Sequence, residues 1–195
     1  HTSMLEPKPE LYRGLTYPWG RGANPTPGEP HRIADGVYWT RFAMPMSLDH
    51  INLWLLQDED GWTVVDTCLN IPTARAAWEQ LFTGFMQGKP VRRVICTHMH
   101  PDHSAGLTDM SNGQLLFPNA ELVMHENELA HWFDDGAMAK VDERSAQLYF
   151  QAGREQVAPY KKRTRLFREG EVFPSVTAVP SHGHPCRLGI DLPPL

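Results

Sequence analysis

The chain has 195 residues, of which 41% are hydrophobic and 21% charged, and its formal net charge is -5 at pH 7. This length accommodates one domain with a substantial core, and the composition is typical of a globular protein rather than a disordered or fibrous one. The acidic balance and the lack of a long basic run argue against a nucleic-acid partner. No apolar run approaches the roughly 18 residues of a membrane span, so no membrane partner is expected either.

Cysteine usage bears on the compartment. Cys68, Cys96 and Cys186 are odd in number and widely spaced, which argues against a disulfide framework and against a cysteine-type zinc site. A reducing compartment is the simpler interpretation, so the cytoplasm is the default expectation. A signal peptide removed before residue 1 would leave no trace in this sequence.

The N-terminal half begins with an arm and continues as strands. Residues 1–35 are rich in proline and glycine, which predicts an extended arm with little regular structure, packed on a domain of residues 36–195. Short β-branched and aromatic runs separated by turn residues then predict strands at 37–42, 51–56 and 62–66. From Pro72 to Phe85 apolar residues recur at helical spacing, which predicts an amphipathic helix that covers the sheet.

The second half of the chain alternates between strands and helices. Strands are predicted at 91–96, 121–125 and 176–180, and helices at 126–133 and roughly 142–157. The short basic cluster at 161–168 is interpreted as solvated surface. Strands first, and strand and helix in alternation afterwards, favour an α/β fold in which helices cover a sheet.

A dense group of metal-ligand side chains follows the strand predicted at 91–96. Residues 98–103 read His-Met-His-Pro-Asp-His, so three imidazoles and one carboxylate occupy six positions. In a loop at the end of a strand, His98 and His100 can face one point while Asp102 and His103 face a neighbouring one, which would suit two adjacent cations. Imidazole and carboxylate ligands without thiolate suit Zn²⁺ first, with iron, manganese or cobalt as alternatives. Surface histidines clustered by chance are the competing interpretation, and the density of ligands disfavours it.

This motif resembles the signature of the metallo-β-lactamase superfamily, His-x-His-x-Asp-His at the end of a strand. Two further segments agree: residues 64–68 resemble the strand of that family that ends in Asp-Thr-Gly, and residues 179–184 resemble the segment that delivers a further histidine ligand. The resemblance implies an αββα sandwich with the metals at one edge of the sheets, and a hydrolase. Residues 49–54 and 97–106 are most similar in style to the glyoxalase II-like and lactonase-like branches.

The resemblance also implies a role for each ligand. His98, His100 and His184 would bind one ion, and Asp102 and His103 would bind the second. A metal-activated water would attack a carbonyl or phosphoryl centre, and Asp102 would orient that water and accept its proton as a catalytic residue.

Asp66 would accept a hydrogen bond from a ligand histidine and so fix its tautomer. His182 competes with His184 as a ligand, although the register of the family favours His184. Capping or surface roles are expected for His125 and His131, and His50 is equally compatible with the mouth of the site and with simple packing.

Two departures from the family pattern modify these expectations. Cys68 stands where the family has glycine, which predicts backbone strain at a position of positive φ. After His184 the family continues with further strands, helices and ligands, whereas this sequence ends at Leu195, so the second half of the sandwich is expected to be truncated. An uncovered apolar face then predicts a homodimer, and one ion rather than two unless Asp191 or another chain supplies a ligand.

The leading hypothesis is therefore a zinc-dependent hydrolase that acts on a small-molecule ester, lactone or thioester. A phosphoester hydrolase of the same fold is the alternative enzyme. A metal-binding but catalytically impaired truncated form is the alternative from another class. Four aromatic residues are compatible with a substrate pocket, but their helical spacing favours the core: Trp132, Phe133, Tyr149 and Phe150.

Overall fold

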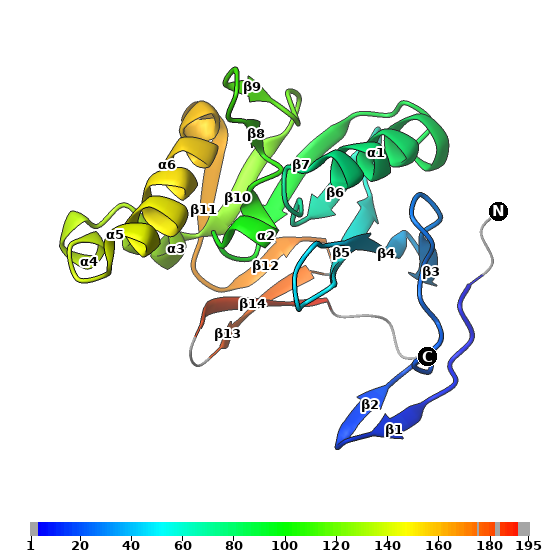
Figure 1. Ribbon diagram of the computed structural model, residues 1–195. Coiled ribbons are helices and arrows are strands. Elements are labelled where there is room, and N and C mark those ends of the chain that lie inside the picture. Colours follow the sequence, from blue (N-terminus) through cyan, green and yellow to red (C-terminus); the bar gives the residue numbers. More distant parts are fainter. Residues whose placement is uncertain (1–3, 175, 182–183, 191–195) are drawn as a thin grey trace.

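The computed structural model describes residues 4–174, 176–181 and 184–190. A seven-stranded sheet in the order β11-β10-β7-β6-β5-β4-β3 forms its centre; helices cover one face, and a three-stranded sheet lies on the other (Figure 1). The strands of the large sheet are β3 (His31–Ala34), β4 (Val37–Ala43), β5 (His50–Gln57), β6 (Trp62–Val65), β7 (Val91–Cys96), β10 (Glu121–His125) and β11 (Thr164–Phe167). The small sheet consists of β12 (Gly170–Phe173), β13 (Val176–Ser181) and β14 (His184–Ile190). Helix, sheet and sheet are three layers of the predicted αββα arrangement, and the predicted fold class is confirmed.

Strand direction changes along the large sheet. Strands β3, β4, β5 and β6 pair antiparallel with their sequence neighbours, whereas β6, β7, β10 and β11 run parallel. Parallel neighbours need a crossover, and the helical segments provide it. The carboxyl ends of β6, β7 and β10 therefore lie along one edge of the sheet.

The helices agree with the predicted pattern. Helix α1 begins at Pro72 as predicted and buries Ala74, Ala77 and Trp78. The helix predicted at 142–157 forms as three consecutive segments. The helical elements are α1 (Pro72–Gln80), the π-helical turn η1 (Leu81–Phe85), α2 (Pro101–Ser104), α3 (Glu126–Trp132), α4 (Asp135–Met138), α5 (Glu143–Ser145), the π-helical turn η2 (Ala146–Gln151), α6 (Ala152–Val157) and the 3₁₀ segment η3 (Ala158–Arg163). None of the helices in the described part of the chain is long and apolar enough to cross a membrane.

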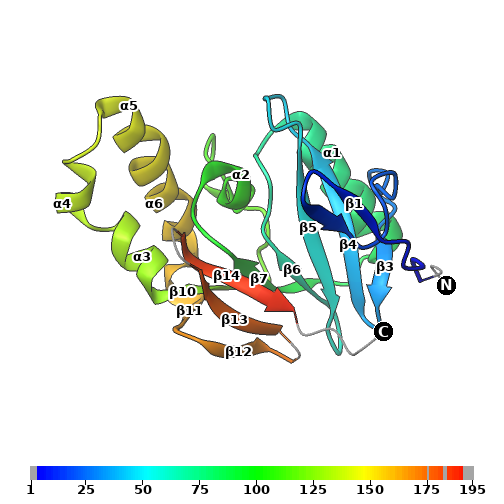
Figure 2. The ribbon, with the colours of Figure 1, turned by 90° about the horizontal axis from the view of Figure 1, so that it is seen from below.

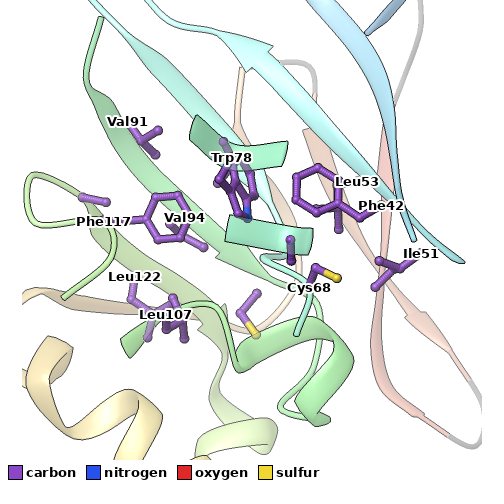
Figure 3. Close-up of a cluster of buried hydrophobic side chains, with 14 of the residues drawn as sticks. Phe42, Ile51, Leu53, Cys68, Trp78, Val91, Val94, Leu107, Phe117 and Leu122 are labelled. Carbon is purple, nitrogen blue, oxygen red and sulfur yellow. The ribbon is translucent and has the colours of Figure 1, made fainter. Parts of the chain in front are cut away.

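The larger hydrophobic cluster lies between the sheet and the helices (Figure 3). Trp78 of α1 is its centre: the indole ring lies 5.0 Å from the Phe42 ring and 5.2 Å from the Phe117 ring, measured between centroids. The indole Nε1 donates a hydrogen bond of 3.0 Å to the backbone oxygen of Thr67. The buried polar atom of Trp78 is thus satisfied, and α1 is tied to the turn that follows β6.

A smaller cluster fills the space between the two sheets. Leu56, Val65, Ile95 and Val123 come from the large sheet, and Val172, Val176 and Ala178 come from the small one. Seen from below, the small sheet overlies the side of β7, β10 and β11, while the N-terminal segment lies beside β4 and β5 (Figure 2). The two faces of the large sheet are therefore covered by different kinds of layer.

The N-terminal arm holds more regular structure than predicted. Strands β1 (Glu10–Tyr12) and β2 (Leu15–Tyr17) form a hairpin, and β3 joins the large sheet as an edge strand. The expectation of little regular structure before residue 36 is therefore wrong in part. Gly36 adopts a φ of 70° in the tight turn between β3 and β4. This turn lets β3 fold back and pair with β4 as the edge strand of the sheet. A second short hairpin is formed by β8 (Thr108–Asp109) and β9 (Gln114–Leu115).

Candidate metal centre

The predicted ligand segment lies at the edge where the parallel strands end. Asp66 follows β6 directly, residues 97–103 follow β7, and α2 begins at Pro101, a residue preorganised for the first turn of a helix. His100 precedes α2 with extended backbone, so the segment changes direction between His100 and Asp102. Because ligand and catalytic groups gather at the carboxyl ends of parallel strands, this edge is the expected place for a site.

Four predicted ligand side chains lie close together at this edge. The His98 ring centroid is 3.9 Å from that of His103 and 4.7 Å from that of His100. The Asp102 carboxylate oxygen Oδ2 lies 3.4 Å from Nε2 of His103. The structure thus brings together His98, His100, Asp102 and His103, which come from one loop and the short helix after it.

The fifth predicted ligand comes from the small sheet. His184 is the first residue of β14, paired in register with Ser181 of β13. The side chain of His184 lies outside the described residues, as do His182 and Asp191. The roles predicted for these three residues stay predictions.

Asp66 connects the end of β6 to the ligand loop. Its carboxylate accepts hydrogen bonds from the backbone nitrogen of Thr97 at 2.8 Å and from Thr97 Oγ1 at 2.7 Å. Its Oδ2 also lies 2.7 Å from Nδ1 of His103. An ionised carboxylate can only accept, so Nδ1 of His103 donates, and Nε2 faces Asp102. This is the arrangement that holds a histidine in one tautomer for a metal.

The charges of the loop are strongly coupled. Burial, followed by the charge of His103, lowers the pKa of His98 to about 4, so this imidazole is neutral at pH 7 and can offer a lone pair. Burial alone would lower the pKa of His103, but hydrogen bonds to Asp102 and Asp66 outweigh it and raise the pKa to about 10. The hydrogen bond from His103 holds the pKa of Asp102 below its usual value. Binding of a cation at Nε2 of His103 therefore requires loss of a proton.

The donor set suits a borderline metal ion by the kind of its side chains. Imidazole nitrogens and one carboxylate oxygen gather in a partly buried loop, with an oriented histidine behind them, and this is the chemistry that zinc prefers. Among the residues whose positions are described, no three His, Cys, Asp or Glu side chains lie in positions from which they could hold one metal ion together. The residues fit a metal by their chemistry, and the metal geometry itself stays a prediction.

The turn after β6 confirms the strain predicted at Cys68. Both Asp66 and Cys68 have positive φ, 63° and 65°, although neither is glycine. Cys68 is fully buried in the larger cluster, and burial raises the pKa of its thiol to about 11. The thiol is therefore protonated at neutral pH, and Cys68 is a packing residue with a strained backbone.

Gly106 lets the ligand segment pack against this turn. A Cβ atom at Gly106 would lie 2.5 Å from the backbone oxygen of Thr67 and 2.8 Å from its Cβ atom. The two segments are joined by hydrogen bonds from Gly106 N to Cys68 O and from Thr67 N to His103 O, both 2.9 Å. Only glycine permits this close approach, so Gly106 is part of the scaffold of the site.

The other histidines and aromatic residues agree only in part with the expectations, because helical spacing favoured the core for four aromatic residues and two of them are exposed. His125 caps α3, with Nδ1 accepting a hydrogen bond from the Asn127 backbone nitrogen at 3.0 Å. His50 Nδ1 contacts the Asp49 carboxylate at 2.6 Å. Of the four aromatic residues considered for a pocket, Trp132 and Phe150 are buried, whereas Phe133 and Tyr149 are exposed. Trp132 and Tyr149 also pack against His100, at centroid distances of 5.6 Å and 5.4 Å.

Sequence analysis did not identify Glu128. This glutamate of α3 is 1% exposed, and its carboxylate accepts hydrogen bonds from the Met99 backbone nitrogen and from Trp132 Nε1. Its position in the sequence could have indicated burial, because Glu128 lies one turn before Trp132, on the helix face predicted to be buried. An acidic residue on such a face needs a partner, and here the partner is the ligand loop itself.

Comparison with known proteins identifies the family. Residues 46–189, more than half of the chain, match the metallo-beta-lactamase superfamily. The acyl-coenzyme A thioesterase MBLAC2 of Homo sapiens is 26% identical over 155 residues, which cover 72% of this chain and 52% of that protein. A linear primary-alkylsulfatase of a Pseudomonas species is 35% identical over 75 residues, which cover 38% of this chain and 10% of the relative.

A solved structure agrees with these matches. The crystal structure of a beta-lactamase domain protein from Burkholderia ambifaria has 32% sequence identity and a TM-score of 0.62, and the match covers 86% of this chain and 55% of that one. This chain thus spans about half the length of the thioesterase and of the solved protein. The strand-end ligand motif, the layered fold and the family match lead to one conclusion: the chain belongs to the metallo-beta-lactamase superfamily.

Proposed function

We propose that this chain carries the metal centre of a zinc-dependent hydrolase that acts on an ester, lactone or thioester. The single observation that carries the proposal is the convergence of His98, His100 and His103 with Asp102 at the carboxyl ends of β6 and β7. His98, His100 and His184 would hold one ion, and Asp102 and His103 would hold a second. Zn²⁺, when bound, would supply an activated water and polarise the acyl oxygen.

The residues of the chain contribute orientation and charge. Asp66 holds Nδ1 of His103, so Nε2 is the nitrogen of this ring that would bind the ion. The lowered pKa of Asp102 keeps its carboxylate ionised at neutral pH, so it can accept a hydrogen bond from water or act as a ligand. Neutral His98 can bind a cation without first releasing a proton. Asp102 is accordingly the proposed catalytic acceptor.

The substrate class is supported by the named relatives. The human relative is an acyl-coenzyme A thioesterase, and its match covers most of this chain, which favours an acyl ester or thioester. The match to a linear primary-alkylsulfatase makes alkyl sulfates a second candidate class. Both reactions release an alcohol or thiol by attack of water on an acyl or sulfuryl centre, so one site could serve either.

Metal analysis combined with a substrate panel tests the proposal. Zinc per chain is measured by elemental analysis, and turnover is measured with aryl esters, lactones, acyl thioesters, alkyl sulfates and phosphoesters. We expect bound zinc, turnover of an acyl substrate, loss of turnover on chelation and at least about a 10²-fold loss of kcat/KM in His100→Ala.

The matched control is His31→Ala, because His31 lies on β3, at the opposite edge of the large sheet from β11, and packs against Trp39. It should retain both zinc and activity. Undiminished turnover in His100→Ala would reject the proposed site, and bound zinc without turnover on any substrate would favour the metal-binding, catalytically impaired form.

The homodimer expected from the sequence stays a prediction. Sedimentation equilibrium of the chain over a range of concentrations checks it, with two chains per particle as the expected result. A single-chain mass at all concentrations would contradict it.

A further inference from the structure

A buried carboxylate lies directly behind the paired histidines of the candidate centre. Glu128, the third residue of α3, has only 1% of its surface exposed. Its atom Oε2 accepts a hydrogen bond of 2.8 Å from the backbone nitrogen of Met99 and one of 2.7 Å from Trp132 Nε1. We infer that Glu128 is a positioning residue that sets the geometry of His98 and His100 for a metal ion; this inference rests on the proposed function.

The first hydrogen bond fixes the backbone between the two histidines. Met99 lies after the end of β7, so its N–H group is beyond the strand pairing of the sheet. The Met99 side chain is buried in the larger cluster, with its terminal carbon near Gly153 of α6. The Met99 side chain and the Glu128 carboxylate thus hold the centre of the His-Met-His segment at two points. Without an acceptor, the buried N–H of Met99 would be unsatisfied, and the segment could relax only by moving both histidines.

The second hydrogen bond fixes a ring that contacts His100. Trp132 lies four residues after Glu128, one turn further along α3, and its indole is largely buried. The Trp132 and His100 ring centroids are 5.6 Å apart and the ring planes are inclined at 66°. A single carboxylate oxygen therefore orients both the backbone before His100 and the aromatic surface against which the His100 imidazole packs.

The partners of Glu128 distinguish it from an ordinary buried ion pair. Within the described part of the chain, Glu128 takes part in no salt bridge. Its carboxylate accepts one hydrogen bond from the backbone N–H of Met99, in the ligand loop, and one from the indole N–H of Trp132. Buried carboxylates need hydrogen bonds to offset desolvation, and here the loop provides one of them. Glu128 and the ligand loop therefore depend on each other for a satisfied geometry, as expected of a group that supports metal ligands.

Two substitutions of Glu128 separate hydrogen bonding from simple packing. Glu128→Gln can place its amide oxygen where Oε2 lies and accept both hydrogen bonds, whereas Glu128→Leu accepts neither. Asp109→Asn is the matched control: Asp109 is also a buried carboxylate with hydrogen bonds, but its described partners are Ser111 and Arg75, outside the ligand loop. Affinities for Zn²⁺ and Co²⁺ are measured by competition with a chelator, and the visible spectrum of the Co²⁺ form reports ligand geometry.

We expect Glu128→Leu to lower metal affinity about 10- to 100-fold and to change the Co²⁺ spectrum, as is usual when a group that orients a metal ligand is lost. Glu128→Gln should stay within about threefold of the parent affinity, and Asp109→Asn should lose stability without losing affinity. A folded Glu128→Leu with parental affinity and an unchanged spectrum overturns the inference. A loss in Glu128→Gln as large as that in Glu128→Leu also overturns it, because charge rather than hydrogen bonding would then be responsible.

A second measurement keeps the inference distinct from the proposed function. The parent chain is titrated first, and failure to bind Zn²⁺ or Co²⁺ rejects the proposed function. In either case, the imidazole NMR signals of His98 and His100 in the metal-free chain report their orientation. The His98 and His100 signals should shift in Glu128→Leu and stay in place in Asp109→Asn. Unshifted signals in Glu128→Leu overturn the inference. If Glu128→Leu does not fold, Trp132→Phe replaces it, since loss of the indole N–H should shift the His100 signal more than the His98 signal.

Discussion

The two faces of the seven-stranded sheet are packed to different degrees. On the helical face, α1 and the segments around α6 enclose a broad cluster centred on Trp78, whereas the other face has a smaller cluster covered by three strands. Met99, which lies within the ligand motif, Leu107, which follows it, and Cys68 all belong to the larger cluster. The loop of the candidate centre is thus supported mainly by the helical face, while His184 comes from the small sheet. Two parts of one proposed centre therefore depend on two layers of different packing.

Two adjacent leucines test this comparison directly. Leu55 and Leu56 are neighbours in β5 with 0% and 1% of their surface exposed, but Leu55 belongs to the larger cluster and Leu56 to the smaller. Replacement of a buried leucine by alanine costs about 2 to 5 kcal/mol, and more where the surroundings cannot relax. We expect Leu55→Ala to lower the free energy of unfolding by about 4 kcal/mol and Leu56→Ala by about 2.5 kcal/mol. Urea denaturation measures both, and an equal or larger loss in Leu56→Ala would reject the comparison.

Gly106 tests whether the ligand segment depends on the turn after β6. In Gly106→Ala the new Cβ atom would meet backbone of Thr67, which cannot rotate away, so we expect a loss of about 3 kcal/mol in the free energy of unfolding. Gly84→Ala is the control, because a Cβ atom there meets nothing within 4 Å. It should be neutral or slightly stabilising in a helical turn. Thermal and urea unfolding check the pair, and a Gly106→Ala protein as stable as the control would contradict this account.

Tyr160 gives the smallest expected effect and a pH dependence. Its hydroxyl donates a hydrogen bond of 2.8 Å to Leu107 O and accepts one of 3.2 Å from Phe117 N, and burial raises its pKa to about 12. The folded chain favours the neutral phenol, so this contribution to stability is fully present below pH 10, the ordinary pKa of tyrosine, and is lost as the pH rises toward 12.

In Tyr160→Phe we expect a loss of about 1 to 2 kcal/mol at pH 7, because the N–H of Phe117 and the carbonyl of Leu107 lose a partner. We also expect a shallower decline in the free energy of unfolding above pH 10, since the variant has one buried phenol fewer to ionise. Urea denaturation at a series of pH values measures both effects. An unchanged alkaline decline would show that Tyr160 does not titrate as its burial indicates.

Several elements were predictable because their local pattern agrees with their tertiary environment. The strand predicted at 91–96 matches β7, and the predicted start of α1 at Pro72 is correct, since β-branched runs and helical apolar spacing were both unambiguous. Strands β3 and β11 were not predicted. Both are short edge strands of four residues that each begin with two polar residues, so their local sequence pattern is weak, and they form by pairing with a neighbouring strand.

The chemistry of residues 98–103 was determined by the sequence itself, because ligand identity and spacing are local properties and the preceding strand is contiguous with them. Tertiary structure alone decided which distant groups support that motif. Asp66 reaches His103 because β6 and β7 are parallel neighbours that end at the same edge, and Glu128 reaches Met99 because α3 begins where β10 ends. Such contacts depend on strand order and helix placement, which residue spacing along one chain does not encode locally.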